Sequence, residues 1–419
     1  MKTFYICTAD CITKGIESQR IYDYLIANDY TFTKNYSKAD LIIITTCAFY
    51  DLEEEQSIRA IKYYMKYKAP SGRIIITGCL PKINPERLKN LGCFEVVYPT
   101  KLESFDNIID SRVKFNSIPI ANKIEKDIQD LPRYYKLEFM NLNRLTIQFF
   151  KEFQLNKEYF QRIVTRFLVE KNRLLHRREK RFYLVIENGC LGNCTYCGIK
   201  FAIGRLKSRS FKEILKEFKK GLASGNNIFY IAGEDVGAYG LDINTNIVEL
   251  LRELFKISGN YKIRIMDFNA KWLIKYYSDL EKIFVENKDR LDFIALGAQS
   301  ASNRILKLMK RGFDINKLRK CLNSLLNKMP NLHINLHIIA GFPGETKEDF
   351  EKTKAFIKEF NFYDITLTGY SDRPNTLASR MSKKISRREI RRRVFDLMKV
   401  RYEIIKKQRN SKEMYCNKH

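Results

Sequence analysis

The decisive stretch of this sequence is Gly189-Cys190-Leu191-Gly192-Asn193-Cys194-Thr195-Tyr196-Cys197, in which three cysteines follow the spacing C-x₃-C-x₂-C. Zinc sites normally use four ligands, commonly as two separated pairs, and no fourth Cys or His stands near this loop in the sequence. Three thiolates on a short loop instead suit a [4Fe–4S] cluster in which one iron keeps an open position. We therefore predict that Cys190, Cys194 and Cys197 hold such a cluster.

From residue 182 onward, strand and helix signals alternate. The predicted strands are 182–186, 228–232, 262–266, 292–296, 333–339 and 364–368. Amphipathic helices fall between them, for example at 211–223 and 247–255. Five or six β/α units predict a partial or full TIM-type barrel, written (β/α)6, whose site lies at the carboxyl ends of the strands.

The N-terminal part shows a second alternation. Apolar strands are expected at 2–8, 40–46, 73–77 and 94–98, with helices at 15–28 and 53–68. This β-α-β-α-β pattern predicts a small, doubly wound α/β domain with a parallel sheet.

Three further cysteines follow the strands of this first domain. Cys47 and Cys79 come directly after the second and third strands, and Cys11 lies in the loop after the first. Because the carboxyl ends of parallel strands line one crevice, the three thiols are expected to converge there. Buried cysteines are common, so any one of them alone would carry little weight.

The loop at 189–197 resembles the signature of the radical S-adenosylmethionine (SAM) superfamily, including the aromatic Tyr196 before its third cysteine. The resemblance implies an enzyme whose cluster binds SAM through the methionine amine and carboxylate. One electron then cleaves a C–S bond of SAM, and the resulting 5′-deoxyadenosyl radical removes a substrate hydrogen. The protein supplies placement and exclusion of water.

The resemblance also implies SAM-binding residues at the strand ends. Gly233 and Glu234 fall where family members hold the methionine amine, and Arg264 would pair with the carboxylate through its guanidinium fork. The loop starting at Gly341 would lie against the cofactor, since glycine allows close backbone approach. The complete set expected at the cofactor is Tyr196, Gly233, Glu234, Arg264, Gln299, Ser300, Gly341 and Glu345, with Ser302 nearby.

Within the superfamily, the chain looks most like the methylthiotransferases, which convert C–H to C–S–CH₃. Cys11, Cys47 and Cys79 resemble the cysteines that hold a second [4Fe–4S] cluster in that family, implying two SAM molecules per cycle. The motifs at 190–197, 233–240, 299–302, 308–311 and 370–376 are most similar to the archaeal and eukaryotic branch. That branch acts on N6-threonylcarbamoyladenosine beside the tRNA anticodon.

Three departures from the family bear on the substrate and on the second cluster. The sequence has a basic helical tail containing Arg391-Arg392-Arg393 in place of the family's small β-barrel (TRAM) domain. The middle segment carries extra basic helices with aromatics such as Tyr159 and Phe160. Asp10 and Lys14 replace the usual Gly and Asn around the first cysteine. The expected domains are 1–120, 121–181, 182–381 and 382–419.

The net charge of the chain does not decide which kind of molecule it binds. The chain has 76 Lys+Arg against 48 Asp+Glu, a net +28, which suits a nucleic acid but equally reflects an AT-rich genome. In one account the basic helices replace the missing barrel and bind tRNA phosphates; in another the substrate is a peptide, protein or small molecule. A third account is an iron–sulfur sensor without turnover, against which the SAM-pocket residues count.

The remaining expectations concern the setting of the enzyme. The N-terminus lacks a signal peptide and no apolar run is long enough to span a bilayer, so we expect a cytoplasmic protein that does not bind membranes. A reducing partner such as flavodoxin or ferredoxin would deliver the electron.

Overall fold

The computed structural model describes residues 2–9, 11–125, 127–131 and 181–416, and the side chains of the last helix as far as residue 406. The chain divides into two compact units, Met1–Lys180 and Arg181–His419, and each unit is described by itself. The predicted basic helices of the middle segment, with Tyr159 and Phe160, and also Asp10, lie outside the described residues.

The first unit is built on a parallel sheet with the strand order β2-β1-β3-β4-β5, and β6 pairs with β1. Its strands are β1 (Thr3–Thr8), β2 (Thr31–Phe32), β3 (Leu41–Thr46), β4 (Arg73–Gly78), β5 (Glu95–Val96) and β6 (Gln129–Asp130). Its α-helices are α1 (Ile12–Ala27), α2 (Asp51–Tyr67), α3 (Leu80–Ile83) and α4 (Phe105–Ile108). The chain winds outward in both directions from β1 and β3, which confirms the doubly wound prediction.

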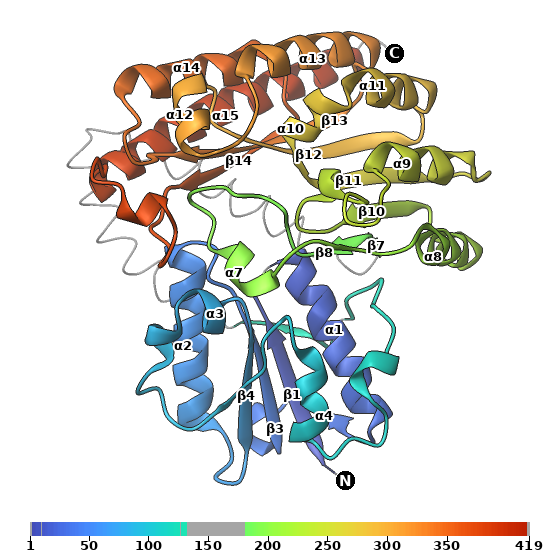
Figure 1. Ribbon diagram of the computed structural model, residues 1–419, viewed down its shortest axis with the longest axis vertical. Helices are drawn as coiled ribbons and strands as arrows, with labels where there is room; N and C mark the ends of the chain where they lie inside the picture. Colours follow the sequence, from blue (N-terminus) through green and yellow to red (C-terminus); the bar gives the residue numbers. More distant parts are fainter. Residues whose placement is uncertain (1, 10, 126, 132–180, 417–419) are drawn as a thin grey trace. The chain divides into compact units, whose positions relative to one another are not determined.

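Burial explains why these segments form the sheet. All residues of β3 are buried, as are all but the first of β1 and of β4, and their side chains are mainly isoleucine and other β-formers. Helices α1 and α2 lie on either side of the sheet (Figure 1), as right-handed crossovers running in opposite directions require.

The second unit contains six parallel strands in the order β14-β13-β12-β11-β10-β7. The strands are β7 (Phe182–Val185), β10 (Ile228–Ala232), β11 (Lys262–Asn269), β12 (Leu291–Gln299), β13 (His333–Ala340) and β14 (Asp364–Gly369). Strand neighbours follow chain order, and among the described residues β7 and β14 do not pair with each other, so the barrel is open. The predicted (β/α)6 partial barrel is therefore confirmed.

The helices of this unit are α7 (Ile199–Ile203), α8 (Phe211–Ala223), α9 (Ile247–Lys256), α10 (Ala270–Lys275), α11 (Tyr277–Glu286), α12 (Asn303–Leu308), α13 (Ile315–Lys328), α14 (Lys347–Glu359) and α15 (Arg387–Cys416). Most of them cover the outside of the barrel, while α7 follows the cysteine loop (Figure 1). A short hairpin, β8 (Glu187–Asn188) with β9 (Lys207–Ser208), closes the base of the cysteine loop.

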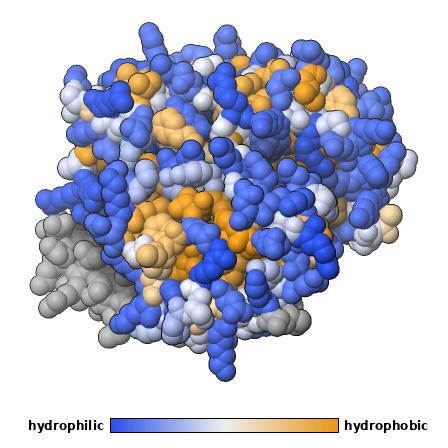
Figure 2. All heavy atoms as spheres, turned by 60° about the horizontal axis from the view of Figure 1, so that its bottom comes forward, coloured by the Kyte–Doolittle hydropathy of each residue, from blue (hydrophilic) through white to orange (hydrophobic). Residues whose placement is uncertain are grey.

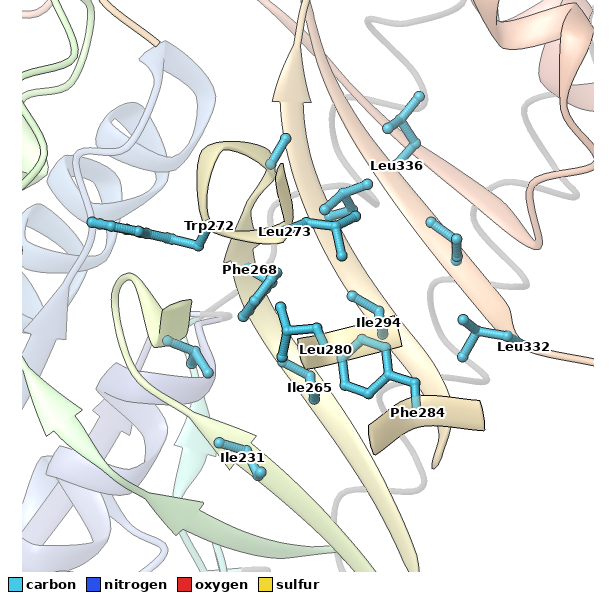
Figure 3. Close-up of a cluster of buried hydrophobic side chains, with 14 of the residues drawn as sticks. Ile231, Ile265, Phe268, Trp272, Leu273, Leu280, Phe284, Ile294, Leu332 and Leu336 are labelled. Carbon is cyan, nitrogen blue, oxygen red and sulfur yellow. The ribbon is translucent and has the colours of Figure 1, made fainter. Parts of the chain in front are cut away.

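The main core lies between strands and helices. Figure 3 shows Ile231, Ile265 and Ile294 on successive strands facing Leu280 and Phe284 of α11. These side chains are at most 2% exposed, so their burial supplies most of the stabilisation of the layer.

The basic tail is part of this unit and does not form a separate arm. Helix α15 packs on β14 and α14, and Leu397 and Val400 belong to the main core. Arg393 is only 6% exposed, and Arg392 is paired with Glu389 and Asp396. In the account in which the basic tail binds phosphates, Arg393 could not take part, because the helix turns that side chain into the protein.

The surface is predominantly hydrophilic. Figure 2 shows charged and polar residues over most of one face, around a patch of apolar residues. Among the residues that the structure describes, no helix is both long and apolar enough to cross a membrane.

Candidate active site

The cysteine loop 189–197 follows the hairpin strand β8 at the carboxyl end of the barrel. Thr195 anchors it, since its backbone N–H donates to Met309 O (3.1 Å) and its hydroxyl donates to Leu308 O (2.9 Å). The Cys190 sulfur accepts the Gly192 N–H at 3.0 Å, and a Cβ at Gly192 would lie 2.9 Å from that sulfur. The loop thus wraps closely around its first thiol, which explains the glycine at position 192.

Burial disfavours free thiolates here. It raises the pKa of Cys190 to about 12, with a further contribution from the charge of Asp235, and raises that of Cys197 to about 11. The thiols of Cys190 and Cys197 therefore stay protonated until a metal cluster replaces the protons, as ligation by thiolates requires. Three half-buried thiols on one short loop fit a [4Fe–4S] cluster with an open iron.

Arg311 is a site residue that the sequence reasoning did not assign. Its guanidinium is 5% exposed and donates to Cys194 Sγ (3.1 Å), Asn269 Oδ1 (2.9 Å) and Gly297 O (2.5 Å). Its Nε is buried without a hydrogen-bond partner among the described residues. The available signal was the motif at 308–311, which had been noted only for its resemblance to the family.

A second missed residue, Glu187, holds the turn after β10. Its Oε1 accepts the backbone N–H groups of Glu234 (2.5 Å) and Asp235 (3.0 Å), and a Cβ on Gly233 would lie 2.1 Å from that oxygen. Burial raises the pKa of Glu187 to about 8, and its Oε2 has no partner among the described residues. Gly233 is therefore needed for packing, and Glu234, which follows it, is half-buried.

Arg264 is not brought to the cysteine loop. It lies near the amino end of β11, where it forms a two-point ion pair with Asp292 (3.0 and 2.9 Å) and donates to Tyr230 OH (2.8 Å). β11 continues to Asn269, beyond the predicted end at residue 266, so position 264 lies well below the barrel mouth. The expected pairing of Arg264 with a cofactor carboxylate is not supported by this geometry.

The residues after β12 divide into two roles. Gln299, half-buried at the strand end, adopts the left-handed conformation (φ 77°), which is uncommon outside glycine. Ser300 Oγ lies 3.4 Å from Thr353 Oγ1, and Ser302 donates to Asp349 Oδ1 at 2.6 Å. The two serines thus fasten the loop to α14, and Gln299 remains as the candidate for contact with a ligand.

The loop after β13 is held by α15. Gly341 (φ 82°) donates its N–H to Glu345 Oε2 at 2.7 Å, and the same oxygen accepts from Arg393 Nη1 at 2.7 Å. Glu345 is 4% exposed and is therefore a structural acceptor within the loop, in contrast to the cofactor contact expected from the sequence. Tyr196 packs against the small apolar cluster under this loop, beside Phe342 and Met309.

In the first unit, the structure brings the other three cysteines to one edge of the sheet. Cys11 caps α1 after β1, while Cys47 and Cys79 directly follow β3 and β4, whose last residues Thr46 and Gly78 are paired. β1 and β3 flank the point where the winding direction reverses, the usual ligand site of such sheets. Burial raises the pKa of Cys47, and the charges of Cys79 and Cys11 raise it further, which places all three thiols within electrostatic reach.

Backbone contacts fix the positions of these thiols. The Cys79 N–H donates to Thr46 O (3.0 Å), and the Cys47 N–H donates to Ser57 Oγ on α2 (3.0 Å). Lys14, one of the residues that departs from the family pattern, is 3% exposed in the first turn of α1 and pairs with Glu17. Across the described part of the chain, no three His, Cys, Asp or Glu side chains lie close enough together to hold a single metal ion. An iron–sulfur cluster makes a different demand, because each of its irons binds at most one cysteine thiolate of the loop.

Two family models match the chain. The model described as the radical SAM superfamily matches residues 184–357, and the model described as uncharacterized protein family UPF0004 matches residues 3–99. The first covers the open barrel with its cysteine loop, and the second covers the sheet that carries the other three cysteines.

Curated relatives match most of the chain. A probable threonylcarbamoyladenosine tRNA methylthiotransferase of Methanocaldococcus jannaschii is 29% identical over 96% of this chain and 83% of its own length. The corresponding protein of Pyrococcus horikoshii is 26% identical over 91% and 79%, respectively. The ribosomal protein uS12 methylthiotransferase RimO of Carboxydothermus hydrogenoformans is 26% identical over 96% and 82%.

Among solved structures, the radical SAM methyltransferase TsrM of Kitasatospora setae superposes with a TM-score of 0.57 at 12% identity, covering 90% of this chain and 77% of that one. At this identity the similarity concerns the fold alone. The chain therefore carries a UPF0004 domain ahead of a radical SAM domain, and it is similar over most of its length to enzymes named methylthiotransferases.

Proposed function

We propose that this chain is a methylthiotransferase that replaces a C–H bond of N6-threonylcarbamoyladenosine, beside the tRNA anticodon, with C–S–CH₃. The observation that carries the proposal is the presence of two separate cysteine triads, each at the carboxyl edge of its own parallel sheet. The chain that bears them resembles tRNA methylthiotransferases over about nine tenths of its length.

The barrel triad would hold the cluster that supplies the electron for SAM cleavage. Cys190, Cys194 and Cys197 would ligate it, and the buried Arg311 would offset the negative charge on the Cys194 sulfur. The unpartnered Glu187 Oε2 and Arg311 Nε mark polar positions next to the loop that a bound cofactor would satisfy.

Cys11, Cys47 and Cys79 would hold the second cluster, which supplies sulfur. Overall, one SAM would give its methyl group to sulfide and leave S-adenosylhomocysteine. A second SAM would end as methionine and 5′-deoxyadenosine, the latter carrying the substrate hydrogen. A reducing partner such as ferredoxin or flavodoxin would supply the electron for this cleavage.

The decisive experiment is nucleoside mass spectrometry of tRNA from cells that express the parent chain, a Cys190→Ala variant or a Cys321→Ala variant. Cys321 is buried in α13 outside both triads and serves as the matched control. A methylthio derivative of N6-threonylcarbamoyladenosine should appear with the parent and the Cys321 variant only. Unchanged tRNA in the presence of parent protein that forms 5′-deoxyadenosine would reject the tRNA substrate.

A protein side chain is the second candidate substrate. It is favoured by the similarity to a uS12 methylthiotransferase, which matches the chain as extensively as the tRNA-modifying relatives do. In that case, mass spectrometry of ribosomal proteins from the same cells would show a Cys190-dependent addition of a methylthio group. If the protein fails to form 5′-deoxyadenosine from SAM under reducing conditions, both substrates are rejected, and an iron–sulfur sensor without turnover is the alternative that is left.

A further inference from the structure

A hollow of about 550 Å³ lies beside the barrel site, outside the residues described so far. One wall is the short helix α10, with Lys271, Trp272 and Lys275, and the other is the turn Gly312–Phe313 leading to Lys317 at the start of α13. The hollow belongs entirely to the second unit, so its shape does not depend on the first.

The hollow combines three lysine amines and one carboxylate, that of Asp314, with aromatic surface. None of the three lysine amines is paired with a carboxylate among the described residues. Two of them lie over the Trp272 ring, Lys271 at 4.2 Å and Lys275 at 5.4 Å from its centroid. The Trp272 ring extends away from Leu273 at the edge of the buried cluster (Figure 3), and Phe313 is half-buried on the facing wall.

Both walls are hydrogen-bonded directly into the candidate active site. Trp272 Nε1 donates to Asp235 (3.0 Å), next to Glu234, while Arg311, which precedes Gly312, donates to Cys194 Sγ. Asn269 joins the walls to each other, because its Oδ1 accepts both the Lys271 N–H that starts α10 (3.2 Å) and Arg311 Nη2 (2.9 Å). Whatever occupies the hollow is therefore held at the rim of the site.

We infer that this hollow binds an RNA strand, with Lys271, Lys275 and Lys317 on phosphates and Phe313 available for stacking by an unpaired base. The inference rests on the proposed tRNA substrate and assigns it a place on the molecule. Lysines act as point charges along a phosphate backbone, and aromatic faces accept any base, a combination that is typical of single-stranded RNA contacts. A purely acidic peptide would use the charges but not the aromatic wall.

The test compares two variants with the same change of charge. The groove variant carries Lys271→Gln, Lys275→Gln and Lys317→Gln, and the control carries Lys212→Gln, Lys216→Gln and Lys219→Gln on α8. The α8 lysines are also exposed and are not paired with a carboxylate among the described residues. Binding of a tRNA anticodon stem–loop is measured by fluorescence anisotropy at several salt concentrations, with polyglutamate as competitor.

The groove variant should lose on the order of tenfold in affinity, and the slope of log K against log salt should shrink by about one per lost phosphate contact, whereas the α8 variant should stay close to the parent. Phe313→Ala should weaken binding on the order of tenfold with an unchanged salt slope. Iron content and 5′-deoxyadenosine formation, measured without RNA, should equal those of the parent and exclude misfolding.

Three outcomes would overturn the assignment in distinguishable ways. If the groove variant matches the α8 variant while the parent binds RNA, the RNA lies elsewhere and the proposed substrate stands. If the parent binds no RNA, the tRNA substrate fails together with the groove. If polyglutamate displaces the stem–loop at equal charge concentration, the hollow is a general polyanion surface with no preference for RNA.

Discussion

At the scale of single residues, the position of Arg311 explains most about the site. It is a buried cation whose partners are a cysteine sulfur, an amide and a carbonyl, so its charge is directed at the Cys194 sulfur, the proposed cluster ligand. Hydrogen bonds and nearby positive charge stabilise the more negative, reduced state of a cluster and so raise its reduction potential.

Arg311→Met should therefore lower the midpoint potential of the barrel cluster and slow its reduction by the electron donor, while Arg311→Lys should recover part of both. The potential is measured by redox titration with electron paramagnetic resonance. Arg264→Met is the matched control: it breaks the ion pair with Asp292 and should cost about 2 kcal/mol of stability. An equal shift of potential in both variants would show that Arg311 acts only through folding.

In the first unit, Gly78 occupies a position where the backbone conformation and the available space both require glycine. Its φ is 87°, and a Cβ would lie 2.2 Å from Thr46 O, between the strands that end in Cys47 and Cys79. Gly78→Ala should force β3 and β4 apart there, at a cost of about 2 kcal/mol or more, and lower the iron content of the first triad.

Gly225→Ala is the control for this substitution, because Gly225 has φ 78° but no atoms within 4 Å of an added Cβ. This variant places alanine in a left-handed backbone conformation without bringing its Cβ against a neighbouring atom. Iron content is measured in a background in which Cys190, Cys194 and Cys197 are replaced by Ala. Full iron loading of the Gly78 variant in that background would contradict the assigned role.

At the scale of elements, the strand pattern of the sequence predicted the second sheet closely. The strand predicted at 228–232 coincides with β10, because continuous apolar residues between polar turns mark a buried parallel strand. β11 is longer than the predicted strand, which ends at residue 266. Its register with β12 shifts between Ile265 and Phe268, and Asp267 has φ 45°, so the alternation of inward and outward side chains breaks before the strand ends. The longer strand places Arg264 near its amino end.

The convergence of the cysteines could be predicted because spacing and strand ends determine it, whereas the residues that support them could not be predicted. Arg311 lies in the irregular turn after α12, and Glu187 lies in a two-residue hairpin strand, so neither has a periodicity to reveal it. The sequence predicts Ser300 and Glu345 as cofactor contacts, with Ser302 nearby, but helices distant in sequence provide the hydrogen-bond partners of all three. Such long-range pairing is not encoded in local pattern.

The pair Glu345–Arg393 gives a test of how α15 supports the barrel loop. Its side chains are 1% and 7% exposed, so removing one partner leaves a buried charge. Arg393→Ala should lower the free energy of unfolding by about 3 kcal/mol. Arg392→Ala, next to it on the surface of the same helix, should cost less than about 1 kcal/mol. Equal costs, measured by urea denaturation, would show that α15 does not hold the loop.

At the scale of the whole molecule, the two triads predict separable metal loading. Anaerobic reconstitution should give about eight irons per chain, and replacing Cys11, Cys47 and Cys79 by Ala should leave about four. That variant should still cleave SAM to 5′-deoxyadenosine but transfer no methylthio group. Iron and sulfide analysis measures the loading, and an unchanged iron content would refute the second cluster.

The packing of α15 also has a consequence for cooperativity. A helix that shares core residues with β14 and closes a buried ion pair cannot detach without exposing both. The barrel and α15 should therefore melt in one calorimetric transition. A backbone cut in the connection between Gly369 and Arg387 should leave two fragments that stay associated, and a separately made α15 peptide should restore a truncated barrel by complementation.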